Sequence, residues 1–340
     1  MLGETWQTAA RHDLVGRFGV GEGGDNRAVA MRQWAGLGFG GSIGAAVAVQ
    51  ARINGELGQR LGDGIAAATI SFGSGLLILA VVFAGSGRLR AGVGRVRAAL
   101  GTGELRWWQL LGGLSGAYFV ACQGLTVATI GVTAFTVAAV AGQLVSSLVV
   151  DRLGWGPGGP TPVTAGRIGA AVLGLVAVLL AVLGRSGTGP VAGHATASML
   201  LVALPLVAGL LVAWQQAVNG RVGAVGGPLS ATLGNFATGM AALVVIEAGV
   251  LVRRGGLGSL PSEPWLYLGG LIGISFVALA VLVVRWIGVL LLGLTSVAGQ
   301  LLASLVLDVV APTGIGLSVS AIIGCVLTFV AVAVAARSRG

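Results

Sequence analysis

The chain contains no lysine and little charge of either sign. Only 9% of its 340 residues are charged and 55% are hydrophobic, whereas a soluble domain carries about 25% charged residues. This composition excludes an ordinary water-soluble protein. Because a Walker A motif needs a lysine to contact the nucleotide phosphates, the lack of lysine also excludes a standard ATP-binding site of that kind.

Residues that build catalytic or metal centres are equally scarce. The chain has two cysteines, Cys122 and Cys325, inside apolar stretches, and two histidines, His12 and His194, in a polar tail and a loop. A membrane enzyme acting on lipids would need clustered histidines or carboxylates. We therefore expect no enzymatic activity, no metal and no cofactor.

The basic residues are all arginines, 20 in number, and they give a net charge of +9. They are scattered through short polar segments and form no basic domain, so no nucleic-acid partner is expected. Their distribution instead indicates topology determinants that also attract anionic lipid headgroups.

Ten apolar segments have the length of about 20 residues that a membrane-spanning helix needs. The sequence therefore predicts an all-α polytopic membrane protein with ten transmembrane helices. The segments cover residues 34–57, 65–84, 108–127, 132–150, 166–184, 198–219, 229–252, 265–284, 287–307 and 317–336. Turn-forming sequence predicts breaks at 62–64, in the arginine-rich stretch 85–106, at Gly131, at 154–160 and at 261–264.

The arginines also predict the orientation. With ten crossings, the side opposite the termini receives only Arg52, Arg60, Arg185, Arg253 and Arg254. Positively charged loops tend to stay in the cytoplasm. We therefore predict a multi-pass protein of a bacterial inner membrane with both termini in the cytoplasm.

The chain divides into a tail and two repeated units. Residues 1–32 are polar, rich in glycine and of mixed charge, and are predicted to form a disordered cytoplasmic tail. The units are 33–190 and 191–340. Their clearest match is between Ala141–Asp151 and Ala298–Asp308, which both read Ala-Gly-Gln, then small and apolar residues, then an aspartate.

The repeat extends along both units. Further matched stretches are 49–55 with 214–220, 71–75 with 235–239, 108–116 with 265–273 and 168–169 with 323–324. Each unit holds five predicted spans. Since five is odd, the second unit must enter the membrane from the opposite side, which predicts two inverted five-helix repeats about a pseudo-two-fold axis in the membrane plane. Substrate sites of such proteins lie between the repeats, near the bilayer midplane.

Three motifs that occur in both units carry a family resemblance: Gln-x-x-x-Asn-Gly, Trp-x-x-x-Gly-Gly and Ala-Gly-Gln-x-x-x-Ser-x-x-x-Asp. Together they resemble the YdcZ-type family of the drug/metabolite transporter superfamily, whose members often occur as single five-helix units that pair. This chain resembles two such units fused. The resemblance implies a ten-helix bundle that moves small metabolites by alternating access. The second unit departs from the pattern after Asp308, where Val-Val-Ala-Pro stands in place of Arg-Leu-Gly-Trp.

Four amides are predicted to contact the substrate. Gln50 and Asn54 lie one turn apart on a helix face, as do Gln215 and Asn219. Primary amides donate and accept hydrogen bonds without charge, which suits a polar neutral or zwitterionic solute. The alternative is that they hydrogen-bond across helices and fix the packing.

Four further residues are included in the predicted substrate site. Gln143 and Ser147 lie on one helix face, and Gln300 and Ser304 occupy the matched positions. For the serines the alternative is a bond to the carbonyl of the preceding turn.

Three carboxylates are candidates for proton coupling. Asp151 and Asp308 lie at helix ends, where the helix dipole is unfavourable for a negative charge, so each should have a partner. Arg152 is adjacent to Asp151, whereas Asp308 has no candidate nearby in sequence. Glu247 lies well inside an apolar run, where ionisable groups are functional candidates.

These observations predict a secondary or facilitative transporter that moves a small polar metabolite by alternating access. The alternative is a structural or regulatory membrane protein that transports nothing. The expected partners are a small-molecule substrate and the lipid bilayer. Because both units lie in one chain, a monomer is expected to suffice.

Overall fold

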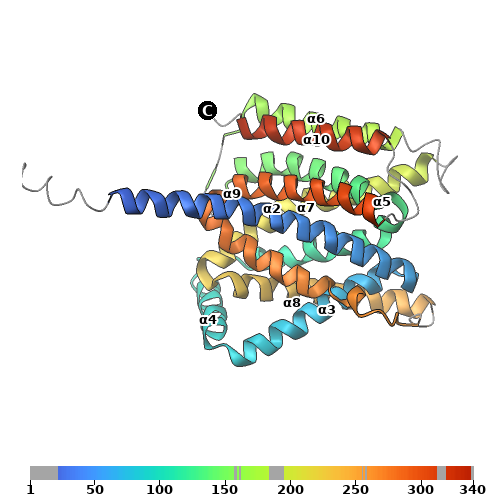
Figure 1. The fold of residues 1–340 in the computed structure, drawn as a ribbon. Helices are drawn as coiled ribbons and strands as arrows, with labels where there is room; N and C mark the ends of the chain where they lie inside the picture. The colour runs from blue at the N-terminus through green and yellow to red at the C-terminus, as the bar shows by residue number, and fades with distance from the viewer. Residues whose placement is uncertain are drawn as a thin grey trace, which may run out of the picture.

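The computed structural model describes residues 22–156, 159–160, 162–183, 195–254, 256, 259–311 and 319–337. Within these ranges the regular secondary structure is entirely helical (Figure 1). The first half of the chain contributes α2 (Glu22–Leu61), α3 (Gly64–Gly85), α4 (Gly87–Gly101), the 3₁₀ helix η1 (Trp107–Leu111), α5 (Gly112–Arg152) and α6 (Ala165–Leu183). The second half contributes α7 (Ala195–Gly226), α8 (Pro228–Arg254), the 3₁₀ helix η2 (Pro264–Tyr267), α9 (Gly269–Val310) and α10 (Val319–Arg337).

Several of these helices are long and apolar enough to cross a membrane. Among the described residues there are 6, namely Gly64–Gly85, Trp107–Arg152, Leu201–Gly226, Pro228–Arg253, Pro264–Val283 and Leu292–Val310. Two shorter apolar helices cover Ala165–Ala177 and Ile322–Val334. The chain is therefore an all-α protein with multiple apolar helices, as the composition predicts.

Helix ends and breaks follow the local sequence. The Asp63 side chain caps α3, because its Oδ1 accepts from the backbone N–H groups of Ile65 at 2.9 Å and Ala66 at 3.1 Å. Gly131 breaks α5, since its φ of 76° and ψ of 161° are not helical and are readily adopted only by glycine. The break that the sequence predicts at Gly131 is confirmed.

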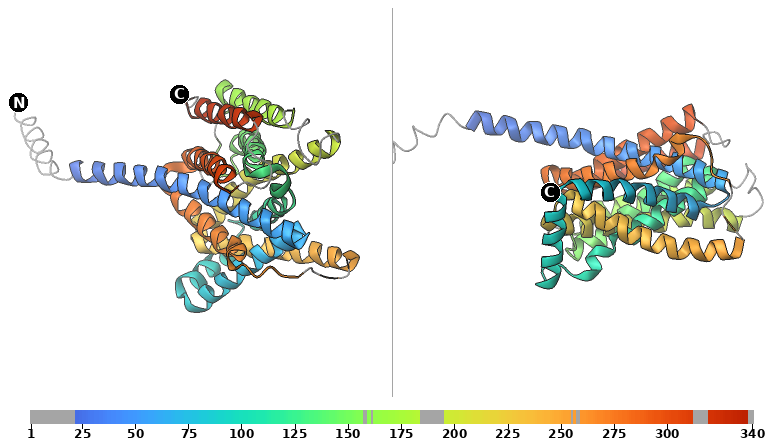
Figure 2. Two further views of the ribbon diagram at one scale, coloured as in Figure 1. Left: turned by 45° about the vertical axis from the view of Figure 1, so that its right-hand side comes forward. Right: turned by 90° about the horizontal axis from the view of Figure 1, so that it is seen from below.

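One sequence expectation needs correction. Residues 22–32, expected in the disordered tail, form the first turns of α2, which extend beyond the rest of the bundle (Figures 1 and 2). They contain no proline, which would interrupt the helix. The remainder of the predicted tail, residues 1–21, lies outside the described residues. The stretch 85–106 separates two apolar helices, as expected, and it contains a helix that the sequence did not predict, α4.

Helix α4 is amphipathic and lies across one end of the bundle (Figure 2, right). Leu89, Gly92, Val96 and Ala99 are buried at helical spacing, and the arginines between them are exposed. Arg95 donates to the carbonyls that end α7, at 3.0 Å from Val225 and 3.2 Å from Gly226. The arginine-rich sequence therefore supplies a cap for a helix of the other half.

Helices of the two halves pack in matched pairs. α2 lies along α9, and α5 lies along α7 (Figures 1 and 2). A Cβ placed on Gly44 of α2 would lie 1.7 Å from the Ser296 carbonyl oxygen of α9, and one on Gly209 of α7 would lie 1.8 Å from that of Ala139 of α5. We call the α2–α9 and α5–α7 contacts the two seams. In each seam, glycines at matched repeat positions let the helix backbones pack in direct contact.

Replacing Gly44 should destabilise the α2–α9 seam. The added methyl group of Gly44→Ala would clash with backbone, and overpacking of this kind costs about 1–3 kcal/mol. Gly41→Ala, one turn earlier, meets nothing within 4 Å and is the matched control. Thermal unfolding in detergent should give a lower Tm than wild type for Gly44→Ala, and an unchanged Tm for Gly41→Ala. Equal melting of the two variants would show that the seam is not packed as described.

Candidate functional site

A cavity of about 1210 Å³, including its part open to solvent, lies between the two halves of the chain. Helices α2, α3 and α5 of the first half and α7, α8 and α9 of the second supply its walls. Its polar lining residues are Gln50, Gln143, Gln215, Gln216, Asn219, Asn235, Ser296 and Gln300. Five of the eight predicted substrate-site residues are thus brought to one cavity.

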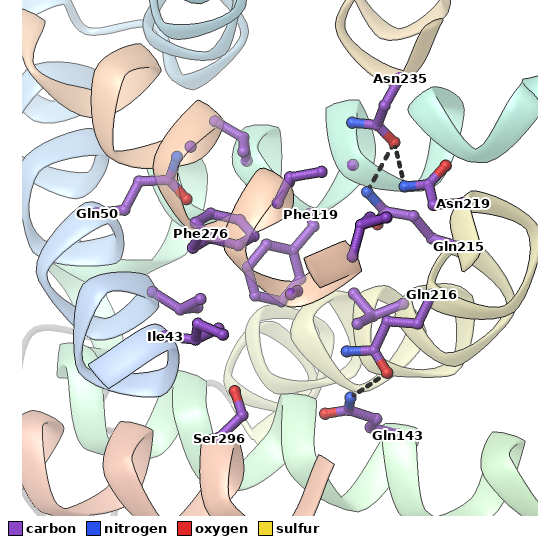
Figure 3. Close-up of a pocket in the computed structure, with 18 of the residues that line it drawn as sticks. Ile43, Gln50, Phe119, Gln143, Gln215, Gln216, Asn219, Asn235, Phe276 and Ser296 are labelled. Carbon is purple, nitrogen blue, oxygen red and sulfur yellow. Dashed lines mark hydrogen bonds between the residues drawn. The ribbon is translucent and has the colours of Figure 1, made fainter. Parts of the chain in front are cut away.

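The rest of the lining is apolar. Phe72 and Phe236, from matched positions of the repeat, stack against each other with ring centroids 4.9 Å apart. Phe119 and Phe276 also line the cavity (Figure 3). Among the described residues that line it, none is acidic or basic. The cavity can therefore offer hydrogen bonds and aromatic surface, without a formal charge from these residues.

On one wall, formed by α5, α7 and α8, the side-chain amides hydrogen-bond to one another. Asn235 Oδ1 accepts from Gln215 Nε2 at 2.9 Å and from Asn219 Nδ2 at 3.0 Å (Figure 3). Gln143 Nε2 donates to Gln216 Oε1 at 3.3 Å. These bonds connect α7 to α8 and α5 to α7, so the same side chains that face the cavity also fix its helices.

The opposite wall is less completely bonded. Gln50 Nε2 donates to the carbonyl of Gly269 at 2.8 Å, which connects α2 to the start of α9. The Oε1 atom of Gln50 and the Nε2 atom of Gln300 are buried without a hydrogen-bond partner among the described residues. Figure 3 shows the Gln50 amide directed toward the cavity beside the ring of Phe276.

Three predicted substrate-site residues do not line the cavity. Asn54 is fully buried and donates to Gln123 Oε1 at 2.7 Å, while its Oδ1 accepts from the Ser71 hydroxyl. Ser147 and Ser304 donate to carbonyls three residues earlier in their own helices, each at 2.8 Å. In this structure all three make the contacts of the alternative interpretation, interhelical packing for the amide and local backbone bonds for the serines.

The two halves make the same contacts with each other in both directions. Gln50 of the first half lies against Gly273 of the second, and Gln215 of the second half lies against Gly116 of the first. Asn54 lies in the same way against Gly269, and its repeat mate Asn219 lies against Gly112. The Trp-x-x-x-Gly-Gly motif of each half thus packs on the Gln-x-x-x-Asn-Gly motif of the other.

The predicted proton-coupling acids have different surroundings. Asp151 forms an ion pair with Arg167 of α6, which is 5% exposed. The neighbour in sequence, Arg152, is exposed. Glu247 is buried in α8 and is not among the described residues that line the cavity. The described residues contain no cluster of three or more histidine, cysteine or acidic side chains that could hold a metal ion.

Asp308 has an unexpected partner in the other half. Its Oδ1 and Oδ2 accept from the backbone N–H groups of Val132 at 3.2 Å and Thr133 at 2.9 Å. These N–H groups directly follow the break at Gly131, where the second part of α5 begins. A carboxylate at a helix N-terminus satisfies N–H groups that lack an intrahelical partner. Asp308 of α9 therefore caps the second part of α5.

Sequence reasoning missed Asn235, Gln216 and Arg167. Asn235 stands directly before Phe236 at a position matched by Ser71, so a search for polar residues at matched repeat positions would have found it. Gln216 is matched by Ala51, and no repeat signal marks it. The pairing of Arg167 with Asp151 depends on how α6 returns against α5, which motif spacing does not reveal.

Comparison with known proteins gives a family and a fold. The family model DMT_YdcZ, described as "Putative inner membrane exporter, YdcZ", matches residues 35–180 and again residues 200–334. A solved structure titled only "Crystal structure of protein" is similar with a TM-score of 0.53 and 18% sequence identity, over 90% of this chain and 96% of that chain. At that identity the similarity shows the fold alone. No curated protein sequence matches this chain.

Removing the Asp308 carboxylate should destabilise the protein. Asp308→Ala leaves the buried N–H groups of Val132 and Thr133 without their acceptor, which costs about 1–3 kcal/mol. Asp308→Asn keeps one acceptor oxygen and should lose less. Glu104→Ala, at an exposed acid, is the control. Thermal unfolding in detergent measures the difference, and an Asp308→Ala variant as stable as wild type would disprove the cap.

Proposed function

The chain belongs to the DMT_YdcZ family as two fused units, and from this premise we propose that it is a secondary or facilitative transporter of a small polar metabolite. The family's description as an inner membrane exporter supports a transporter in preference to an enzyme, and it agrees with the multiple apolar helices of this chain. The observation that carries the proposal is the cavity between the halves, lined by amides at matched repeat positions. We place the substrate there, in contact with Gln50, Gln143, Gln215, Asn219 and Gln300.

We further propose that the two units, 33–190 and 191–340, form ten spans as inverted repeats. Counting α5 as two spans at its break, and α9 as two spans because its 42 residues are long enough for both, gives five spans for each unit. Contacts at one end of the bundle support this topology. Arg60 at the end of α2 pairs with Glu263 before η2, and Asp308 caps the α5 break. Ten crossings place all of these segments on the side opposite the termini.

Contacts at the other end give the same support. Arg95 of α4 binds carbonyls at the end of α7. Arg221 donates to the carbonyls of Gly154 and Trp155, each at 2.8 Å. Ten crossings place these segments on the side of the termini. The matched helices α2 and α7 then end on opposite sides of the membrane, as inversion requires.

Alternating access follows from this arrangement in the proposed mechanism. The halves meet through exchanged pairs of contacts, so a rocking motion can open the cavity to one side while it closes the other. The break at Gly131 gives α5 a point at which its two parts can change angle. Proton coupling through Asp151, Asp308 or Glu247 stays a prediction, and no step of this mechanism depends on it.

Filling the cavity should stop transport. Val212 lines the cavity, so Val212→Trp places an indole where the substrate would pass. Val245→Trp makes the same change on α8 at a side chain that is 74% exposed, outside the cavity. We expect proteoliposomes screened with a metabolite panel to show flux with wild type and Val245→Trp, and about tenfold less flux with Val212→Trp.

Two outcomes would contradict the proposal. Product formation from a solute or lipid would indicate an enzyme. Absence of flux for the whole panel, with a folded and reconstituted protein, would favour the structural or regulatory alternative.

A further inference from the structure

Two polar atoms at the cavity wall lack a hydrogen-bond partner among the described residues. Gln50 is 2% exposed, and because its Nε2 donates to the carbonyl of Gly269, the unpaired atom must be the acceptor Oε1. Gln300 is 6% exposed and leaves the donor Nε2 unpaired. One wall of the cavity therefore holds one unused acceptor and one unused donor.

The repeats differ in the partner of the Gln50 amide nitrogen. Gln215, the mate of Gln50, donates to Asn235, which also accepts from Asn219. The position that matches Asn235 is occupied by Ser71, whose shorter side chain donates to Asn54. Ser71 is thus engaged with the asparagine of its own half, and the Gln50 amide bonds to backbone through its nitrogen only.

A second difference explains the unused donor. Gln143, the mate of Gln300, donates to Gln216 (Figure 3). The position that matches Gln216 is occupied by Ala51, which has no polar side-chain atom. The internal partner available in one half is therefore missing in the other.

The two unpaired amides lie on the same wall of the cavity, along the α2–α9 seam. A Cβ on Gly44 would lie 2.6 Å from the backbone nitrogen of Gln300, so Gln300 stands beside Gly44. Gln50 is six residues further along α2, which corresponds to about 9 Å of helix rise. The two residues are therefore separated along the seam, and a molecule with a donor at one end and an acceptor at the other could pair with both amides.

The chemistry of the lining sets the character of such a molecule. An unpaired buried amide costs free energy that a bound partner recovers. The described lining has no acidic or basic side chain, so a charged solute would exchange its hydration for neutral amides and apolar surface only. The four phenylalanines favour an apolar or aromatic body between the polar ends.

We propose, building on the transport function above, that the substrate is an uncharged solute with an apolar body, a donor for Gln50 Oε1 and an acceptor for Gln300 Nε2. The α2–α9 wall recognises it, and the amides of the α5–α7 wall mainly hold their helices. The repeats are therefore matched in fold but unequal in recognition.

Binding of a matched set of probes tests the proposal. The first probe is para-hydroxybenzylacetone, an uncharged molecule with a phenol donor at one end and a ketone acceptor at the other. Its methyl ether lacks the donor, para-butylphenol lacks the acceptor, and para-hydroxyphenylpropionate carries a negative charge. Calorimetry on the purified full chain should give a Kd for the first probe about tenfold lower than for the other three.

Variants locate the binding groups. Gln50→Met and Gln300→Met should each weaken binding of the first probe about tenfold. Gln123→Met is the control, because Gln123 is fully buried and leaves its Nε2 unpaired but does not line the cavity. Gln143→Met should weaken binding less than Gln300→Met. If loss of the bond to Gly269 prevents Gln50→Met from folding, the comparison of Gln300→Met with Gln123→Met decides.

Three results would overturn the proposal: no binding of the first probe, equally tight binding of the propionate, or an equal loss of affinity in Gln123→Met and Gln300→Met. Flux separates this proposal from the transport function. Selective binding with no flux of any solute would remove the transport function and leave the recognition pair standing. Flux of charged solutes only would do the reverse.

Discussion

A polar group inside a lipid bilayer must find its hydrogen-bond partner within the protein, because lipid tails supply none. The described helices meet this requirement both within one helix and between helices. Ser147 and Ser304 return to their own backbone, and Asn54 joins Gln123 across helices. The requirement is left unmet at the cavity wall by Gln50 and Gln300.

Close packing of the helix backbones positions the polar groups that bond between helices. The glycines of the α2–α9 and α5–α7 seams bring helices from different halves into direct contact. Each Trp-x-x-x-Gly-Gly motif then receives the amides of the other half, and Phe72 meets Phe236 where the halves join. The cavity is therefore built by the repeat itself. The chemistry of its two walls differs because Ala51 and Ser71 replace the polar partners Gln216 and Asn235.

The features predicted correctly from the sequence are those that depend on local residue pattern and on the internal repeat. The apolar helices, the break at Gly131 and the cavity position of five matched amides all follow from periodicity and repeated motifs. The partners of Asp151 and Asp308 did not follow, because Arg167 and the amides after Gly131 reach them through packing between helices. Asn54 was predicted beside its mate Asn219 in the site, yet Gln123 and Ser71 hold it outside the cavity. The sequence did not reveal the amphipathic helix α4, because its many arginines are also typical of a loop between spans.

In the proposed inverted arrangement, matched positions of the two halves lie on opposite sides of the membrane. Thr102 and Ser259 occupy matched positions, and both are exposed. A single cysteine is introduced at each position, as Thr102→Cys or Ser259→Cys, and is labelled with a membrane-impermeant thiol reagent. The native Cys122 and Cys325 are buried and should not react. Inverted repeats predict labelling at position 259 in intact spheroplasts, and at position 102 only after the membrane is opened. Labelling of both positions from the same side would contradict this arrangement.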